Sequence, residues 1–175
     1  MKLEQTILEM TQELESKTVE WIYRAIEKTR ENDSNIYPET NRRLDEKYGK
    51  AHSRDKVFAT PAIKAQVIEE LIGTNVYNIA MTFIYKGASR NLRNEIIIEA
   101  VKKDYDSKRK ALQTKIEKLA GTNEIVEISS IDNEGDKLSC FAYLDDGSKI
   151  QIYTIPAGGW NIQKFHFRGL AKRLK

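Results

Sequence analysis

The sequence predicts an α+β protein, in which an N-terminal helical bundle with two long helices is followed by a small antiparallel β-meander. Two observations predict this fold class. Over the first 120 residues, apolar side chains recur every three or four positions, which is the period of an amphipathic helix. Beyond Gly121 the period shortens to two, as in a half-buried strand. We therefore expect a helical region at 1–120 and a sheet region with a basic C-terminal arm at 121–175, packed as one unit.

The first long helix is expected over residues 3–30, which contain neither proline nor glycine. Its apolar stripe consists of Leu3, Ile7, Met10, Leu14, Trp21, Ile22 and Ile26. The run Asn-Asp-Ser-Asn at 32–35 is expected to end this helix, because such side chains compete for backbone hydrogen bonds. After it, the sequence allows a short helix from Pro38 to Tyr48 and then a polar loop over 51–58.

A pair of short helices is expected on either side of Gly73. The first begins at Thr60-Pro61, because a threonine hydroxyl can cap free N–H groups and proline at the first helical position loses no hydrogen bond. The second is capped by Asn75 and ends at Gly87. The spacing is similar to that of a helix-turn-helix, but the second helix is too apolar to read a DNA groove. An ordinary helical hairpin is therefore favoured.

A second long helix is expected over 89–120, with Gly121 as its stop. Its second half, 102–118, is crowded with charged residues, so the helix cannot be buried on all sides. We expect it to pack along a single apolar seam, against helix 3–30 of the same chain or of a second copy. The second arrangement would make the chain a homo-oligomer through its long helices.

The sheet is expected to be a meander of consecutive antiparallel strands. The strands are predicted at 124–131, 137–144, 148–155 and 160–168. Asp132–Gly135 and Asp145–Gly147 are predicted as the turns, since Asp-Gly tolerates positive φ. Neighbouring strands joined by such short turns usually pair.

Composition excludes several classes of function. The single cysteine, Cys140, rules out an intramolecular disulfide and a cysteine-rich zinc site. The two histidines, His52 and His166, form no metal-ligand spacing, and no glycine-rich phosphate loop is present. We therefore expect no metal, no cofactor and no catalytic constellation. The sequence also lacks a signal peptide or an apolar stretch that could span a membrane, which favours a cytoplasmic protein.

The C-terminal segment is the candidate functional site. From Lys164 onward it contains five Lys or Arg residues and no acid, and aromatic rings alternate with these cations. Cations neutralise phosphates and flat rings stack on unpaired bases, so the mixture suits single-stranded nucleic acid. The candidate binding residues are Trp160, Lys164, His166, Arg168, Lys172, Arg173 and Lys175. The alternative is a half-buried strand followed by a solvated basic tail.

Three functions remain open. The leading interpretation is a non-enzymatic binding or regulatory accessory protein that associates with nucleic acid or with a nucleic-acid-handling protein. The second is a small metal-independent ribonuclease, like those of bacterial toxins, since helices followed by an antiparallel meander is their general layout. Its candidate catalytic residues would be His166, Arg168, Lys149 and Tyr153. The third is a structural component of an oligomeric assembly.

Overall fold

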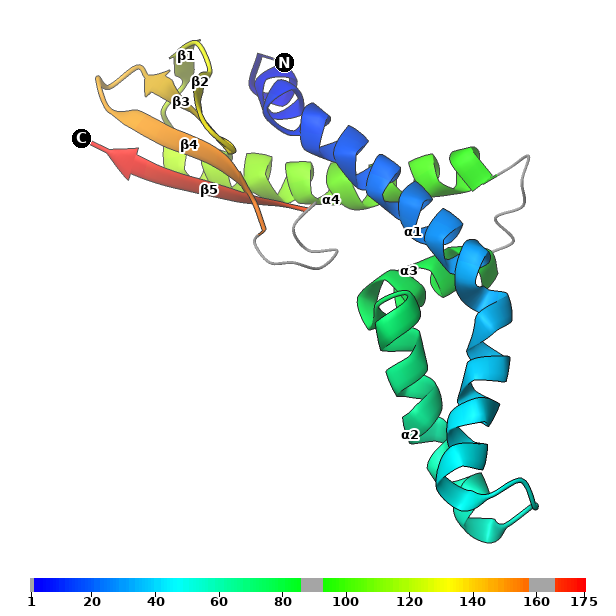
Figure 1. Cartoon of the computed structure of the whole chain (residues 1–175). Helices are drawn as coiled ribbons and strands as arrows, with labels where there is room; N and C mark the ends of the chain where they lie inside the picture. The colour runs from blue at the N-terminus through cyan, green and yellow to red at the C-terminus, as the bar shows by residue number, and fades with distance from the viewer. Residues whose placement is uncertain (1, 86–92, 158–165) are drawn as a thin grey trace. The chain divides into compact units, whose positions relative to one another are not determined.

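The computed structural model describes residues 2–85, 93–157 and 166–175, and over these residues the chain is an α+β protein (Figure 1). Its helices are α1 (Lys2–Tyr48), α2 (Arg54–Leu71), α3 (Thr74–Tyr85) and α4 (Arg93–Ala120). Its strands are β1 (Ile125–Ile128), β2 (Asp132–Glu134), β3 (Lys137–Leu144), β4 (Lys149–Pro156) and β5 (Phe167–Leu174). The predicted fold class is confirmed, and α1 and α4 are the longest of the described helices.

The first helix is longer than predicted. It continues through the polar run 32–35 and through Pro38, so the end predicted at 32–35 is wrong. Ile36, Thr40 and Leu44 are at most 6% exposed, and their spacing of four continues the buried stripe. Burial of this face outweighs both the preference of Asn, Asp and Ser for turns and the backbone hydrogen bond that a proline removes.

The second helix begins earlier than predicted. Ser53 is its N-cap, because its side chain accepts a hydrogen bond from the backbone N–H of Lys56 at 3.3 Å. The loop predicted over 51–58 and the start predicted at Thr60-Pro61 are therefore wrong. The hydroxyl of Thr60 donates to the Lys56 carbonyl at 2.7 Å, inside the helix, and Pro61 lies within it.

The third helix begins next to Gly73, as predicted, but its cap differs. Gly73 has a φ of 101°, which permits the tight connection between α2 and α3. The backbone N–H of Thr74 donates to the carboxylate of Glu69 at 2.7 Å, so the preceding helix supplies the cap that we assigned to Asn75. The end predicted at Gly87, like the start of the helix predicted from 89, lies outside the described residues.

The sheet is antiparallel throughout, with the order β1-β3-β4-β5, and β2 also pairs with β3. The turn at Asp145–Gly147 is confirmed by the pairing of β3 with β4. The predicted turn at Asp132–Gly135 is shorter, because Asp132–Glu134 forms β2 and only Gly135 and its neighbour turn. The basic arm expected at the C-terminus is itself a strand, β5, paired with β4 along its length. Most of the strand predicted at 160–168 lies outside the described residues.

The chain folds into two compact units. One consists of residues 1–20 and 98–175, and the other of residues 21–97. The expected regions at 1–120 and 121–175 divide the chain between its helices and its strands. The two compact units instead group the segments that pack together, and their boundaries fall within α1 and α4. The first unit contains the sheet, the beginning of α1 and most of α4, and we call it the α/β unit. The other is the helical unit.

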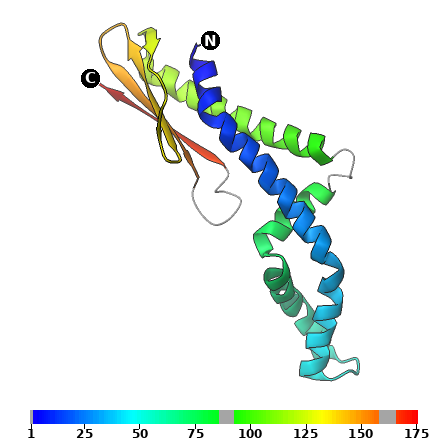
Figure 2. The ribbon, with the colours of Figure 1, turned by 45° about the horizontal axis from the view of Figure 1, so that its top comes forward.

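The core of the α/β unit lies between the sheet and two helical segments that cover one of its faces (Figures 1 and 2). Its buried members are Leu3, Ile7, Met10, Leu112, Ile116, Ala120, Cys140, Ala142, Leu144, Ile150 and Ile152. The beginning of the α1 stripe therefore packs against α4 of the same chain. Leu3, Ile7 and Met10 are 8%, 1% and 1% exposed, so these three side chains offer no apolar surface to a second copy.

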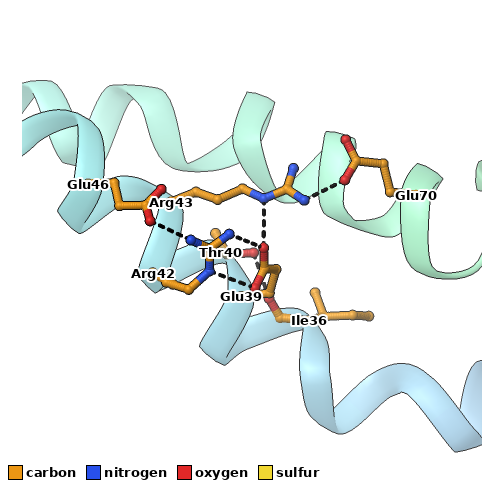
Figure 3. Close-up of polar contacts among 7 residues, drawn as sticks. All are labelled: Ile36, Glu39, Thr40, Arg42, Arg43, Glu46 and Glu70. Atoms are coloured by element: carbon orange, nitrogen blue, oxygen red, sulfur yellow. Dashed lines mark hydrogen bonds and ion pairs between the residues drawn. The ribbon is translucent and has the colours of Figure 1, made fainter.

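The helical unit is held by apolar packing and by an ion-pair network. Ile36 of α1 packs against Val67 and Ile68 of α2 and against Ile72, the C-cap of α2. On the adjoining surface, Arg43 donates to Glu39 on its own helix at 2.9 Å and reaches across to Glu70 of α2 (Figure 3). The same Glu39 accepts from Arg42, whose hydrogen bonds, followed by those of Arg43, lower the pKa of Glu39 to about 2.

Candidate nucleic-acid interface

The two faces of the sheet differ in burial. Along β3 and β4 the buried residues fall at every second position, on the face that packs against the helices, as at Cys140, Ile150 and Ile152. The residues between them point away from the helices, because side chains alternate across a strand. None of these outward-pointing residues of β3, β4 and β5 is buried. We call this the open face of the sheet.

The register of the strands sets the open face out in four rows. The rows are Tyr143–Lys149–Leu174, Phe141–Gln151–Lys172, Ser139–Tyr153–Leu170 and, at the far end, Ile155–Arg168, with Lys137 two residues before Ser139 on β3. Three aromatic rings therefore lie on one surface, each within one or two rows of the next. Neighbouring strands are about 4.8 Å apart, so a surface of this kind has the dimensions of a few nucleotides.

The rings of the open face are accompanied by cations. Lys149 Nζ lies 4.4 Å from the centroid of Phe141, and Lys137 Nζ lies 4.5 Å from that of Tyr153. The rings of Phe141 and Tyr143 are neighbours, with centroids 6.4 Å apart. A base that stacks on the same side of these rings would have to displace the ammonium groups. A lysine on a flexible four-carbon stem can leave the ring, so the displaced cation would remain near the phosphate of that base.

The charges of the open face are unevenly distributed. The outward positions of β3, β4 and β5 carry four cations, Lys137, Lys149, Arg168 and Lys172, and no acid. Three acids border this face on the side of β1 and β2, because Glu127, Asp132 and Glu134 pair with the outward residues Tyr143, Ser139 and Lys137 of β3. The positive strip therefore runs over β4 and β5, with an acidic border along β1 and β2.

The structure places the C-terminal candidate residues in different surroundings. Arg168 and Lys172 are exposed on the open face, and Lys175 is exposed after the end of β5. Arg173 points to the helix side, where its guanidinium donates to the carbonyls of Leu119 and Ala120 at 2.8 and 3.3 Å. It also donates to Asn123, Asp146 and Ser148. Arg173 thus caps the end of α4. Trp160 and Lys164 lie outside the described residues.

His166 contacts α4 and not the open face. Its Nδ1 lies 2.9 Å from Lys108 Nζ and 3.1 Å from a carboxylate oxygen of Asp104, and its ring stacks at 6.3 Å on Tyr105. Partial burial and the charge of Lys108 lower the pKa of His166, while Asp104 acts in the opposite direction. The neutral imidazole is the form that this position favours.

The four ribonuclease candidates are not brought together. Lys149, Tyr153 and Arg168 share the open face, where Tyr153 donates to Gln151 at 3.4 Å, whereas His166 contacts Asp104 and Lys108 of α4. General acid–base catalysis needs its groups within hydrogen-bond reach of one reacting centre, directly or through one water. The open face offers rings and cations but no imidazole among its described residues.

Three residues of the open face were missed by the sequence reasoning: Lys137, Phe141 and Tyr143. The signal was present, because Phe141 and Tyr143 alternate with buried residues of the predicted strand 137–144. The signal was overlooked because only the C-terminal segment was considered as a candidate site. Listing the outward residues of all predicted strands together would have joined these rings with the basic strand.

Other kinds of site find little support in the described part of the chain. No group of three or more His, Cys, Asp or Glu side chains gathers there as metal ligands. None of the helices described is both long and apolar enough to cross a membrane. Comparisons with protein-family models, with curated proteins and with solved structures found no match to this chain.

Proposed function

We propose that this protein is a non-enzymatic accessory factor that binds single-stranded nucleic acid on the open face of its sheet. The observation that carries the proposal is the set of three rings and four cations, without an acid, on the outward positions of β3, β4 and β5. Bases would stack on Phe141, Tyr143 and Tyr153, and phosphates would contact the cations around them.

The chemistry of the surface favours single strands over duplexes. A base can lie flat on an aromatic ring only when it is unpaired and exposed, which is the condition in a loop or a single strand. The broad face of a multi-stranded sheet does not enter a major groove as a helix does. The predicted selectivity is modest, because every base has a π-face and the cations read only phosphate.

The experiment is a titration of fluorescein-labelled oligouridylate and oligothymidylate with the full chain at two salt concentrations. The test variant carries Lys149→Gln, Arg168→Gln and Lys172→Gln. The control variant carries Lys102→Gln, Lys103→Gln and Lys110→Gln, which removes the same charge from exposed positions of α4. We expect the test variant to lower the logarithmic salt slope by about 2, since each phosphate contact contributes roughly 0.7 on a single strand.

A second arm separates stacking from charge. Phe141→Leu keeps an apolar side chain at a half-exposed position and removes the flat ring. We expect it to weaken binding roughly tenfold with an unchanged salt slope, because a stacked base contributes about 1–3 kcal/mol. Equal binding by the parent and both the charge and ring variants would overturn the proposal.

The alternatives are distinguishable in the same experiment. Cleavage of oligouridylate in the presence of a chelator, lost in Tyr153→Phe, would replace the proposal with the ribonuclease interpretation. No binding at low salt, together with a defined oligomer in light scattering, would replace it with a structural assembly component. Binding without cleavage by a chain of any oligomeric state supports the accessory factor.

A further inference from the structure

β5 is an edge strand of the described sheet. β5 ends the strand order, and no described strand lies on its outer side. The backbone N–H of Ala157 donates to the His166 carbonyl at 2.8 Å, which fixes the phase of the ladder. Because hydrogen-bonded and non-hydrogen-bonded pairs alternate in antiparallel strands, the even-numbered residues from 168 to 174 bond to β4.

The odd-numbered residues of β5 therefore direct their backbone groups outward. They are Phe167, Gly169, Ala171 and Arg173. Pro156 agrees with this phase, since it has no N–H and stands opposite Phe167 in a pair without ladder bonds. A row of outward N–H and C=O groups on an edge strand is a template for another extended chain.

A groove runs between this edge and α4. It has a volume of about 270 Å³ and is lined by Lys108, Ala111, Leu112, Lys115, Phe167 and Gly169. A Cβ on Gly169 would come within 2.8 Å of the Leu112 side chain, so any larger residue there would force that side chain to move. The floor is apolar, one wall is the strand edge, and the other wall is a helix. An extended peptide added to a strand edge uses this combination of backbone bonds and side-chain pockets.

The charges around the groove select the occupant. Lys108 and Lys115 lie on the helix wall, and no acid is among the lining residues. The neighbouring acid, Asp104, is engaged with His166 and Lys108. Two copies of the chain pairing through β5 would bring Lys115, Arg168 and Lys172 of each copy close to the same cations of the other. Like charges disfavour that pairing and favour an acidic chain.

We propose that the groove between β5 and α4 binds an extended acidic peptide segment of a partner protein, which adds to the sheet as a strand beside β5. Apolar side chains of the segment would lie over Leu112 and Phe167, and its carboxylates would contact Lys108 and Lys115. This site is separate from the open face, because the outward side chains of β5 and its outward backbone groups belong to different residues.

The test uses a fluorescein-labelled peptide of eight residues in which valine and glutamate alternate, titrated against the full chain by fluorescence anisotropy. The key variant is Ala171→Pro, which removes one outward N–H, keeps the ladder with β4, and places proline where an edge strand tolerates it. Ala171→Ser is the matched control. We expect Ala171→Pro to weaken binding about tenfold, the effect of one lost hydrogen bond with its clash, and Ala171→Ser to bind like the parent.

Charge is tested separately from the backbone. Lys115→Glu should weaken binding of the valine–glutamate peptide and permit binding of a valine–lysine peptide, which the parent should not bind. Circular dichroism confirms that each variant is folded. The proposal is overturned if the folded parent does not bind the valine–glutamate peptide, or if Ala171→Pro binds it as tightly as the parent. Labelled oligouridylate should bind Ala171→Pro unchanged, and its displacement by the peptide would overturn the separation of the two sites.

Discussion

The hydroxyl of Thr18 in α1 and the phenol of Tyr105 in α4 lie 2.9 Å apart in the interior of the α/β unit, although 87 residues separate them in sequence. Thr18 also donates to the Leu14 carbonyl on its own helix. Burial raises the pKa of Tyr105 to about 12, so the phenol stays neutral at physiological pH. The contact links α1 to α4, and separating the two helices would cost the buried Tyr105 hydroxyl this hydrogen-bond partner.

Tyr105→Phe should therefore destabilise the α/β unit modestly. The ring and its contact with Phe167 at 5.3 Å remain, and only the hydrogen-bonding group is removed. We expect a loss of about 1 kcal/mol in the free energy of unfolding, measured by urea denaturation. Tyr143→Phe, on the open face of the sheet in the same unit, is the control and should be nearly neutral. An equal effect of both variants would contradict the role of the buried contact.

Replacing Arg109 should lower the free energy of unfolding by more than Tyr105→Phe does. This residue is 9% exposed, and its guanidinium donates to Thr11 at 2.7 Å, to Asp106 at 2.9 Å and to Glu15. Arg109→Met keeps much of the side-chain volume but leaves the carboxylate of Glu15 without its partner in a largely buried position. We expect a destabilisation of about 3 kcal/mol in urea. The double variant with Glu15→Gln should recover part of it, and additive losses would contradict the coupling.

His166 should make the stability of the α/β unit depend on pH. Its folded-state pKa is lowered from 6.5 by burial and by Lys108, against the opposing effect of Asp104. The unfolded chain therefore binds more protons near that pH, so the contribution is complete above about pH 6.5 and is lost as the pH falls below it. His166→Gln should reduce the loss of stability between about pH 7.5 and pH 5.5. A pH dependence identical to that of the parent would contradict this assignment.

The helical unit should be sensitive to acid through Glu39. Hydrogen bonds from Arg42 and Arg43 lower its pKa from an ordinary value of 4.5 to about 2. A carboxylate with a lowered pKa stabilises the fold above its unfolded pKa, and the effect is lost as the pH falls from about 4.5 towards 2. Glu39→Gln should flatten the pH dependence of the stability in this range. Amide hydrogen exchange in α2 is the measurement. Glu46→Gln, which keeps both contacts between Glu39 and its arginines, is the matched control.

The sequence predicted those elements whose local signals and tertiary packing agree. The strand over 137–144 and the hairpin at Asp145–Gly147 combine strict alternation with an Asp-Gly turn, so no other arrangement competes. The helix stop at Gly121 was predicted for the same reason, and the structure gives it a φ of 62°. These elements could be predicted because the local pattern, the turn residues and the tertiary packing all favour the same structure.

Errors arose where packing overrides a local signal. The polar run 32–35 and Pro38 both argue for a helix end, yet Ile36, Thr40 and Leu44 carry the buried stripe past them. Only tertiary contacts reveal that this face is covered by α2. The candidate site shows the same limit, because the C-terminal cations were read as one arm. Pairing with β4 divides them, so that Arg168 and Lys172 face outward and Arg173 caps α4.

The order of the two units along the chain has a consequence for synthesis. The helical unit is a continuous stretch, residues 21–97, inserted between the two segments of the α/β unit. It can fold as soon as it leaves the ribosome, whereas Leu3, Ile7 and Met10 must wait for the strands that bury them. Until α4 and the strands have been synthesised, the apolar stripe at the beginning of α1 remains exposed to solvent. Chaperones would meet the nascent chain at its first helix.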